Sequence, residues 1–130
     1  MRTWFRRIGY GVLLWAIPYA ISIPLLPLQA SDVAAFKGIM AFVGSVTAAI
    51  LAVLYFKHIK NEYIRESIYV AAVWVILNWL LDFATVLPFT HQTLTQYFLQ
   101  IGIEYVGGGA FILAIGYLLE KKSRAITPQQ

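Results

Sequence analysis

At 130 residues, the chain has room for one domain and for no separate catalytic lobe. Only 12% of its residues are charged and 60% are hydrophobic, whereas a water-soluble surface needs about twice that share of charge, so lipid must be the solvent for most of the surface. The chain has no cysteine, which excludes disulfide bonds, thiol redox chemistry and thiolate metal sites.

Four apolar stretches are long enough to cross a membrane as helices, because about 20 residues at about 1.5 Å per residue span a hydrocarbon core about 30 Å thick. The sequence therefore predicts an all-α polytopic membrane protein, a four-helix transmembrane bundle forming one domain, with helices at about 8–27, 33–56, 67–88 and 97–119. Pro18 and Pro24 should kink the first helix. Ser31-Asp32 offers an N-cap to the second, and Pro88 should end the third.

The first and third predicted helices share a weak pattern. Residues 15–20, followed four residues later by Pro24, match residues 79–84, followed four residues later by Pro88, at four positions. A duplicated two-helix hairpin, related by an axis along the membrane normal, would give this pattern. A chance match between aromatic-rich helices would give it as well.

Basic residues predict the orientation. They precede the first helix, separate the second from the third and follow the fourth: Arg2, Arg6, Arg7, Lys57, Lys60, Arg65, Lys121, Lys122 and Arg124. By the positive-inside rule, both termini are expected in the cytoplasm, with the bundle in the plasma (inner) membrane. Topology also explains the net charge of +4 better than nucleic-acid binding does. The alternative, a secretory signal cleaved before Ser31, fits less well because the apolar run is long for a signal.

The residues most able to carry chemistry are polar groups in the outer third of the predicted membrane region. Asn78 and Asp82 are four residues apart and share one face of the third helix, and Gln100 and Glu104 share one face of the fourth. Lys37 lies in the same layer, near the start of the second helix. Because an ionised group facing lipid is costly, these side chains are expected to face the bundle interior, a water-filled cavity or a partner subunit.

Two interpretations of this polar cluster remain open. A short outer loop joins the third and fourth predicted helices, so Asp82 and Glu104 can approach each other. One nearby lysine cannot neutralise both carboxylates, so in the first interpretation they share an exchangeable proton. Alternatively, Lys37 forms a structural ion pair with one carboxylate, and the other is protonated and hydrogen-bonded to Asn78 or Gln100.

Glycines recur every seven residues on the fourth predicted helix, on the side opposite Glu104: Gly102, Gly109 and Gly116. Such a stripe predicts a helix-packing or homodimer face. Close packing against the small residues of the second predicted helix would explain it most simply, and the run Gly107-Gly108-Gly109 also allows a hinge beside Glu104.

Two functions of different class follow as expectations. The protein is either a small cation- or proton-coupled transporter or channel with its site at Asp82 and Glu104, or a non-transporting accessory subunit or assembly factor that meets a homodimer partner or another membrane subunit. The sequence has no nucleophile motif, phosphate-binding loop or set of metal ligands that would predict an enzyme. His58 and His91 belong to opposite faces of the membrane, so no haem or metal cofactor is expected.

Overall fold

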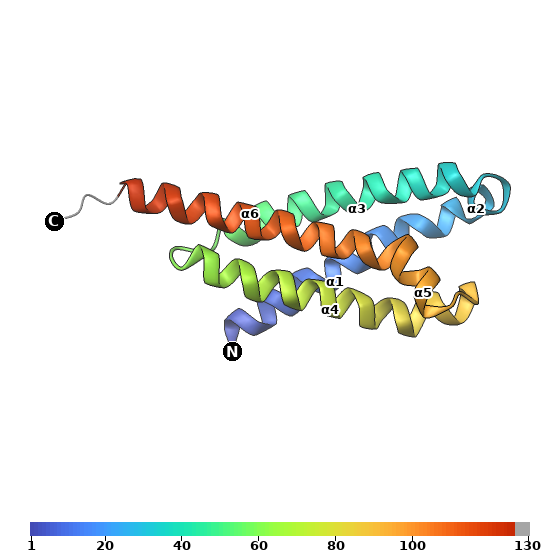
Figure 1. The fold of residues 1–130 in the computed structure, drawn as a ribbon, viewed down its shortest axis with the longest axis horizontal. Helices are drawn as coiled ribbons and strands as arrows, with labels where there is room; N and C mark the ends of the chain where they lie inside the picture. The colour runs from blue at the N-terminus through green and yellow to red at the C-terminus, as the bar shows by residue number, and fades with distance from the viewer. Residues whose placement is uncertain (127–130) are drawn as a thin grey trace.

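The computed structural model describes residues 1–126, and every apolar stretch in it is helical (Figure 1). The elements in chain order are α1 (Arg2–Ser22), η1 (Ile23–Leu25), α2 (Leu26–Ser31), α3 (Val33–Phe56), α4 (Tyr63–Thr90), α5 (Leu94–Tyr97), η2 (Phe98–Gly102) and α6 (Ile103–Ile126). Together they make four candidate membrane spans by length and hydropathy, at Arg2–Ser31, Val33–Phe56, Tyr63–Thr90 and Leu94–Ile126.

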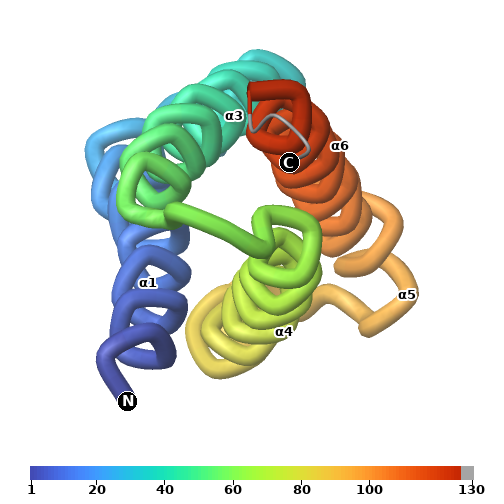
Figure 2. Tube along the Cα trace, turned by 90° about the vertical axis from the view of Figure 1, so that its left-hand side faces the viewer, coloured from blue at the N-terminus to red at the C-terminus, as the bar shows by residue number. Residues whose placement is uncertain are grey.

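The four spans lie roughly alongside one another, and seen end-on they follow the order α1, α3, α6, α4 around the bundle (Figure 2). Both ends of the described chain lie at one end of the bundle, together with the 57–62 loop (Figure 1). We call this the basic end, because nine of the ten lysines and arginines belong to its segments. Lys37 is the exception and belongs to the opposite half, the far end, where the turn into α3 and the 91–93 loop lie.

The first span is longer than predicted and is interrupted. Pro18 lies within a continuous α1, whereas Pro24 lies in η1, a single 3-10 turn that separates α1 from α2. Proline cannot donate to the helical ladder, and a 3-10 turn is a common way to absorb that loss. The hydroxyl of Ser22 donates to the carbonyl of Tyr19 at 2.6 Å, which satisfies a backbone acceptor beside the break.

The other spans differ from the prediction mainly at their ends. α3 spans the predicted range, and the Asp32 carboxylate caps it by accepting from the Ala35 amide at 3.0 Å. α4 continues two residues past Pro88 to Thr90, and His91, the residue that follows it, has a left-handed φ of 51°. The fourth span begins early because Thr93 and Gln96 form a capping box, and it contains a π-helical segment, η2.

The apolar core lies in the half of the bundle nearest the basic end. Its fully buried members come from three spans, with Tyr55 on α3, Val70 and Trp74 on α4 and Ile112 on α6. Many large apolar side chains elsewhere are exposed around the bundle, as expected where lipid is the solvent. Beside its polar contacts, the far half has a smaller aromatic cluster whose rings pack edge to face: Trp79, Phe83, Tyr97 and Phe98.

The glycine stripe packs within the chain. A Cβ on Gly109 would lie 3.3 Å from a methyl of Val75, and one on Gly116 would overlap Ser67 and lie 2.9 Å from the carbonyl oxygen of Tyr63. All three neighbours belong to α4, and α6 packs far more closely on α4 than on α3. Gly109 and Gly116 thus serve the α4–α6 contact and not a contact with the small residues of α3. A Cβ on Gly102 would instead meet the rings of Phe98 and Tyr97 in its own span.

Candidate functional site

Asp82 is the centre of a buried polar cluster in the far half. Its side chain comes from α4, and the residue is 3% exposed. Oδ1 accepts a hydrogen bond from the Trp15 indole of α1 at 3.0 Å, and Oδ2 accepts from the hydroxyls of Tyr97 at 2.7 Å and Tyr105 at 2.9 Å. One carboxylate therefore joins α1, α4 and both parts of the fourth span.

The π-helical segment explains how both tyrosines reach the same carboxylate. Tyr97 and Tyr105 are eight residues apart, a spacing that in an uninterrupted α-helix would point their side chains about 80° apart. The extra residue that η2 takes up makes the spacing equivalent to about seven residues, which reduces the divergence to about 20°. The indole of Trp79 also donates to the carbonyl of Gly102, the last residue of η2, at 3.1 Å.

Asn78 lies one turn from Asp82 on the same face of α4 and is fully buried. Its amide nitrogen donates to the carbonyl of Trp74 at 2.8 Å and to that of Gly11 on α1 at 3.4 Å. Its Oδ1 atom has no hydrogen-bond partner among the described residues. Asn78 thus joins α4 to α1 and leaves one buried acceptor unpaired.

Lys37 and Glu104 are both exposed and do not meet in an ion pair. The Lys37 ammonium donates instead to the Gln100 amide oxygen at 2.8 Å, and the Gln92 amide donates to the same atom at 3.3 Å. Within residues 1–126, Glu104 forms no hydrogen bond or ion pair, although it lies close enough to Lys37 for an electrostatic attraction.

Asp82 and Glu104 consequently belong to two different environments. The adjacent residue, Tyr105, takes the inward position on α6 and contacts Asp82, which leaves Glu104 on the outer face of the bundle. Neither the shared proton nor the Lys37–carboxylate pair expected from the sequence corresponds to a contact in the structure. Asp82 is paired only with neutral donors, and no basic side chain in the described chain forms an ion pair with it.

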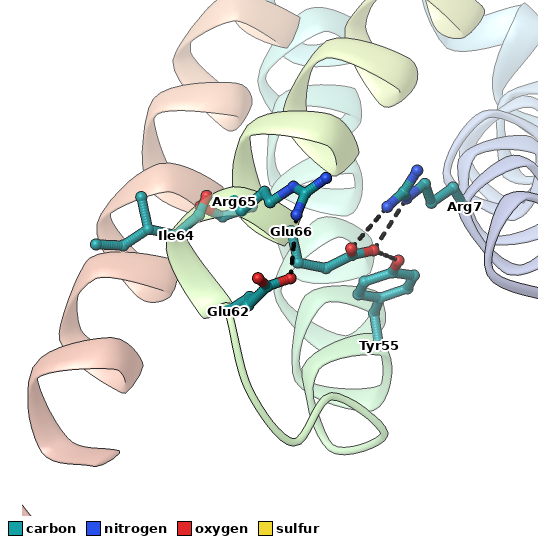
Figure 3. A network of polar contacts seen from close by, with 7 residues as sticks. Arg7, Tyr55, Glu62, Ile64, Arg65 and Glu66 are labelled. Atoms are coloured by element: carbon teal, nitrogen blue, oxygen red, sulfur yellow. Dashed lines mark hydrogen bonds and ion pairs between the residues drawn. The ribbon is translucent and has the colours of Figure 1, made fainter. Parts of the chain in front are cut away.

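A second cluster, at the basic end, was missed from the sequence. The Arg7 guanidinium donates to both carboxylate oxygens of Glu66, from Nε at 3.0 Å and from Nη2 at 2.7 Å, and the Tyr55 hydroxyl donates to Oε1 (Figure 3). The guanidinium also lies over the rings of Trp4 and Tyr69, with its carbon 4.7 and 4.6 Å from their centroids. We call Arg7, Glu66 and Tyr55 the clamp, because they join α1, α4 and α3.

No group of three or more histidine, aspartate and glutamate side chains converges within residues 1–126. Comparison of the chain with protein-family models, with characterised proteins and with solved structures gave no match.

Proposed function

We propose that this chain is a non-transporting integral membrane subunit that assembles with a second copy of itself through the exposed outer face of α3 and α6. The observation that carries the proposal is the division between the two intramembrane carboxylates. Asp82 has all its partners inside the chain, whereas Glu104 is exposed and has none in the part of the chain that the structure describes.

The proposal includes four membrane crossings with both termini in the cytoplasm, in the plasma (inner) membrane. The position of the basic residues supports this orientation, because nine of the ten belong to the end that holds the termini and the 57–62 loop.

The environment of Asp82 supports a structural role. Three neutral side chains donate to its oxygens, which suits a carboxylate acting only as an acceptor. A transport site must exchange its ligand, whereas fixed indole and phenol donors occupy three of the roughly four acceptor positions of this carboxylate. Asp82 therefore serves to hold three spans together in the far half of the bundle.

Glu104 supplies the reason for a partner. It lies ten residues beyond Leu94, which places it about 15 Å along the fourth span from the far end. A carboxylate at such depth facing lipid costs on the order of 3 kcal/mol or more, and the usual remedy is a partner with opposite charge. A second protein that covers this surface would shield the Glu104 carboxylate from lipid and so remove that cost.

A second copy fits this surface because the face carries both signs of charge at one depth. Lys37 on α3 reaches Gln100, one turn from Glu104, so the ammonium and the carboxylate share a layer. In a two-fold dimer with its axis along the bundle, the lysine of each copy can meet the glutamate of the other. Gly107 has open space where a Cβ would lie, so the backbones can approach closely at this face.

Charge reversal tests the dimer directly. Lys37→Glu alone and Glu104→Lys alone should each abolish self-association, because each places like charges opposite one another. An equimolar mixture of the two variants should associate again, since every contact across the interface then pairs opposite charges. Lys121→Glu, a reversal at the basic end, is the matched control and should leave association unchanged.

Cross-linking provides the readout, since the natural chain has no cysteine. Phe111→Cys lies two turns from Glu104 on the exposed face of α6, and Ile76→Cys lies on an exposed part of α4. In liposomes, only the first should form a disulfide-linked dimer. Phe111→Cys is therefore introduced into every chain. If the mixture of reversed variants then fails to cross-link while Phe111→Cys alone does, the lysine–glutamate pairing is wrong. If Phe111→Cys alone never cross-links, the second copy is wrong.

Transport remains the second candidate because of one observation, the buried Oδ1 of Asn78 without a partner one turn from Asp82. A water or cation at this atom would extend a polar path toward Asp82. Asp82→Asn distinguishes the two functions. If Asp82 is a structural group, Asp82→Asn should have a lower free energy of unfolding than the parent protein, and neither protein should give ion or proton flux in liposomes. Flux in the parent that Asp82→Asn abolishes would establish transport and overturn the proposal.

A further inference from the structure

A shallow hollow lies at the basic end, between the start of α1 and the 57–62 loop. Its lining includes the donors Thr3, Arg6, Lys60 and Asn61, together with Glu62 and Glu66. The hollow is separate from Asp82, Glu104 and the proposed dimer face, which belong to the far half. Neither self-association nor the clamp accounts for its free basic groups.

The two acids of the hollow already have basic partners. Glu66 accepts both guanidinium donors of Arg7, and Glu62 pairs with Arg65 at 3.4 Å (Figure 3). Their charges are thus balanced by arginines that do not line the hollow. Glu66 attracts Arg6 electrostatically. Both carboxylates in the lining of the hollow already have a basic partner, however, so neither is available to pair with Arg6.

The arginine and the lysine of the hollow have no such partners, whereas His58, the third basic residue of its lining, has its Nδ1 atom 2.8 Å from the carbonyl oxygen of Leu54. Within the described range, Arg6 and Lys60 form neither an ion pair nor a hydrogen bond. They contribute two positive charges to one concave surface, beside the hydroxyl of Thr3 and the amide of Asn61. A guanidinium presents a planar fork of donors that matches two oxygens of a phosphate, and an ammonium binds a third oxygen as a point charge.

The clamp also fixes the shape of the hollow. Arg7, which follows Arg6 in the chain, ties α1 to Glu66 at the start of α4, so the two walls of the hollow are held by a buried ion pair. A site whose walls are already positioned loses less entropy when it binds a ligand.

We infer that this hollow binds a phosphate anion, held by Arg6 and Lys60 with Thr3 and Asn61 as further donors. Two sources present this chemistry at the end of a membrane span: the headgroup of an anionic phospholipid and a soluble phosphate. The site lies where four apolar spans meet a basic rim, which favours the headgroup.

Thermal unfolding of the purified protein in a neutral detergent tests the inference, with three probes added separately. Phosphatidylglycerol carries a net negative phosphodiester, phosphatidylcholine carries the same group neutralised by its choline, and inorganic phosphate has no acyl chain. We expect phosphatidylglycerol to raise the unfolding midpoint and phosphatidylcholine to leave it unchanged. A rise with inorganic phosphate alone, of the same size, would support the site and assign it to a soluble ligand.

The variants separate a specific site from general surface charge. Arg6→Gln/Lys60→Gln should raise the half-saturating lipid concentration about tenfold or more, because it removes two charge-assisted contacts. Lys57→Gln/Lys121→Gln removes the same charge outside the hollow and should leave that concentration within about twofold. Arg6→Lys/Lys60→Arg keeps the charge and should recover most of the binding.

Folding is checked separately by the unfolding midpoint without any probe, which should not differ between the two double glutamine variants. Equal losses of binding in these two variants would overturn the inference in favour of a diffuse surface potential. The absence of any shift in the parent with both phosphatidylglycerol and inorganic phosphate would also overturn it.

Discussion

Replacing either Arg7 or Glu66 alone should destabilise the bundle more than replacing the two together. Glu66→Leu leaves the Arg7 guanidinium without either of its carboxylate acceptors, and it leaves the Tyr55 hydroxyl without a partner. Arg7→Met has the converse effect and leaves the Glu66 charge uncompensated. The double replacement, Arg7→Met/Glu66→Leu, removes both charges and places two apolar side chains where they met.

The burial of the pair sets the size of the effect. The side chains of Arg7 and Glu66 are 9% and 12% exposed, so each charge has limited access to water, although Glu66 also lines the open hollow. Breaking a buried pair costs about 3–5 kcal/mol, and the residual exposure places each single replacement near the lower end of that range. Replacing the whole pair by apolar residues is about neutral in itself, so the double variant should lose only the roughly 1–3 kcal/mol that the buried Tyr55 hydroxyl costs without its acceptor.

Equilibrium unfolding in mixed micelles measures these differences as free energies of unfolding, and a double-mutant cycle yields the coupling between the two residues. The pair Arg65 and Glu62 is the matched control, because both side chains are 66% exposed and should show no measurable coupling. A Glu66→Leu variant no less stable than the double variant would refute the account of the clamp.

Three further replacements test the packing of the spans by the same unfolding measurement. Gly116→Ala should cost about 1–3 kcal/mol, because the new Cβ would lie 2.9 Å from a backbone oxygen of α4, whereas Gly107→Ala, with open space, should raise stability by about 0.5–1 kcal/mol. Tyr97→Phe should cost about 1–2 kcal/mol by removing one donor to Asp82, and a neutral result would mean that this hydrogen bond contributes nothing. His91→Gly should stabilise the protein by about 0.5–1 kcal/mol, because φ is 51° at this residue, and a loss instead would show that the imidazole makes a contact of its own.

The sequence was sufficient for the helices because their signals are local. Run length and hydropathy define the four spans, and the Asp32 cap fixes the start of α3. The break at Pro24 and the continuation of α4 past Pro88 could not be distinguished beforehand, since the same residue type gives both outcomes. Whether proline ends a helix depends on what replaces its missing donor, and that is set by neighbouring groups in space.

The clamp was missed because its members already had a sufficient local explanation. Arg7 fits the positive-inside rule and Glu66 fits a solvated turn, and 59 residues separate them in the chain. No periodicity links two residues at such a distance. One signal was available: Arg7 is the third arginine of the first span and extends furthest into it, where an unpaired guanidinium is least favourable.

Two residues of the candidate site, Asn78 and Asp82, were named from the sequence, but the partners of Asp82 were not. Asn78 and Asp82 share a face of α4, as their spacing requires, and both are buried. The positions of Tyr105 and Glu104 depend on the register of α6, and the π-helical segment shifts that register by one residue. A single extra residue in the turn decides which of two neighbours faces Asp82, and hydropathy carries no information about it.

Under the proposed function, the basic half of the bundle provides stability and the far half provides the surface for assembly. Arg7 and Glu66 close the basic half with a buried charge pair over an apolar core, so that half can fold without a partner. The far half is held by Asp82 and leaves Lys37 and Glu104 exposed. Loss of the clamp should therefore lower the unfolding free energy without changing which reversed-charge variants associate, whereas Glu104→Lys should change association and leave the unfolding of the single chain nearly as it was. A variant that moved both quantities together would show that the partner is needed to complete the fold.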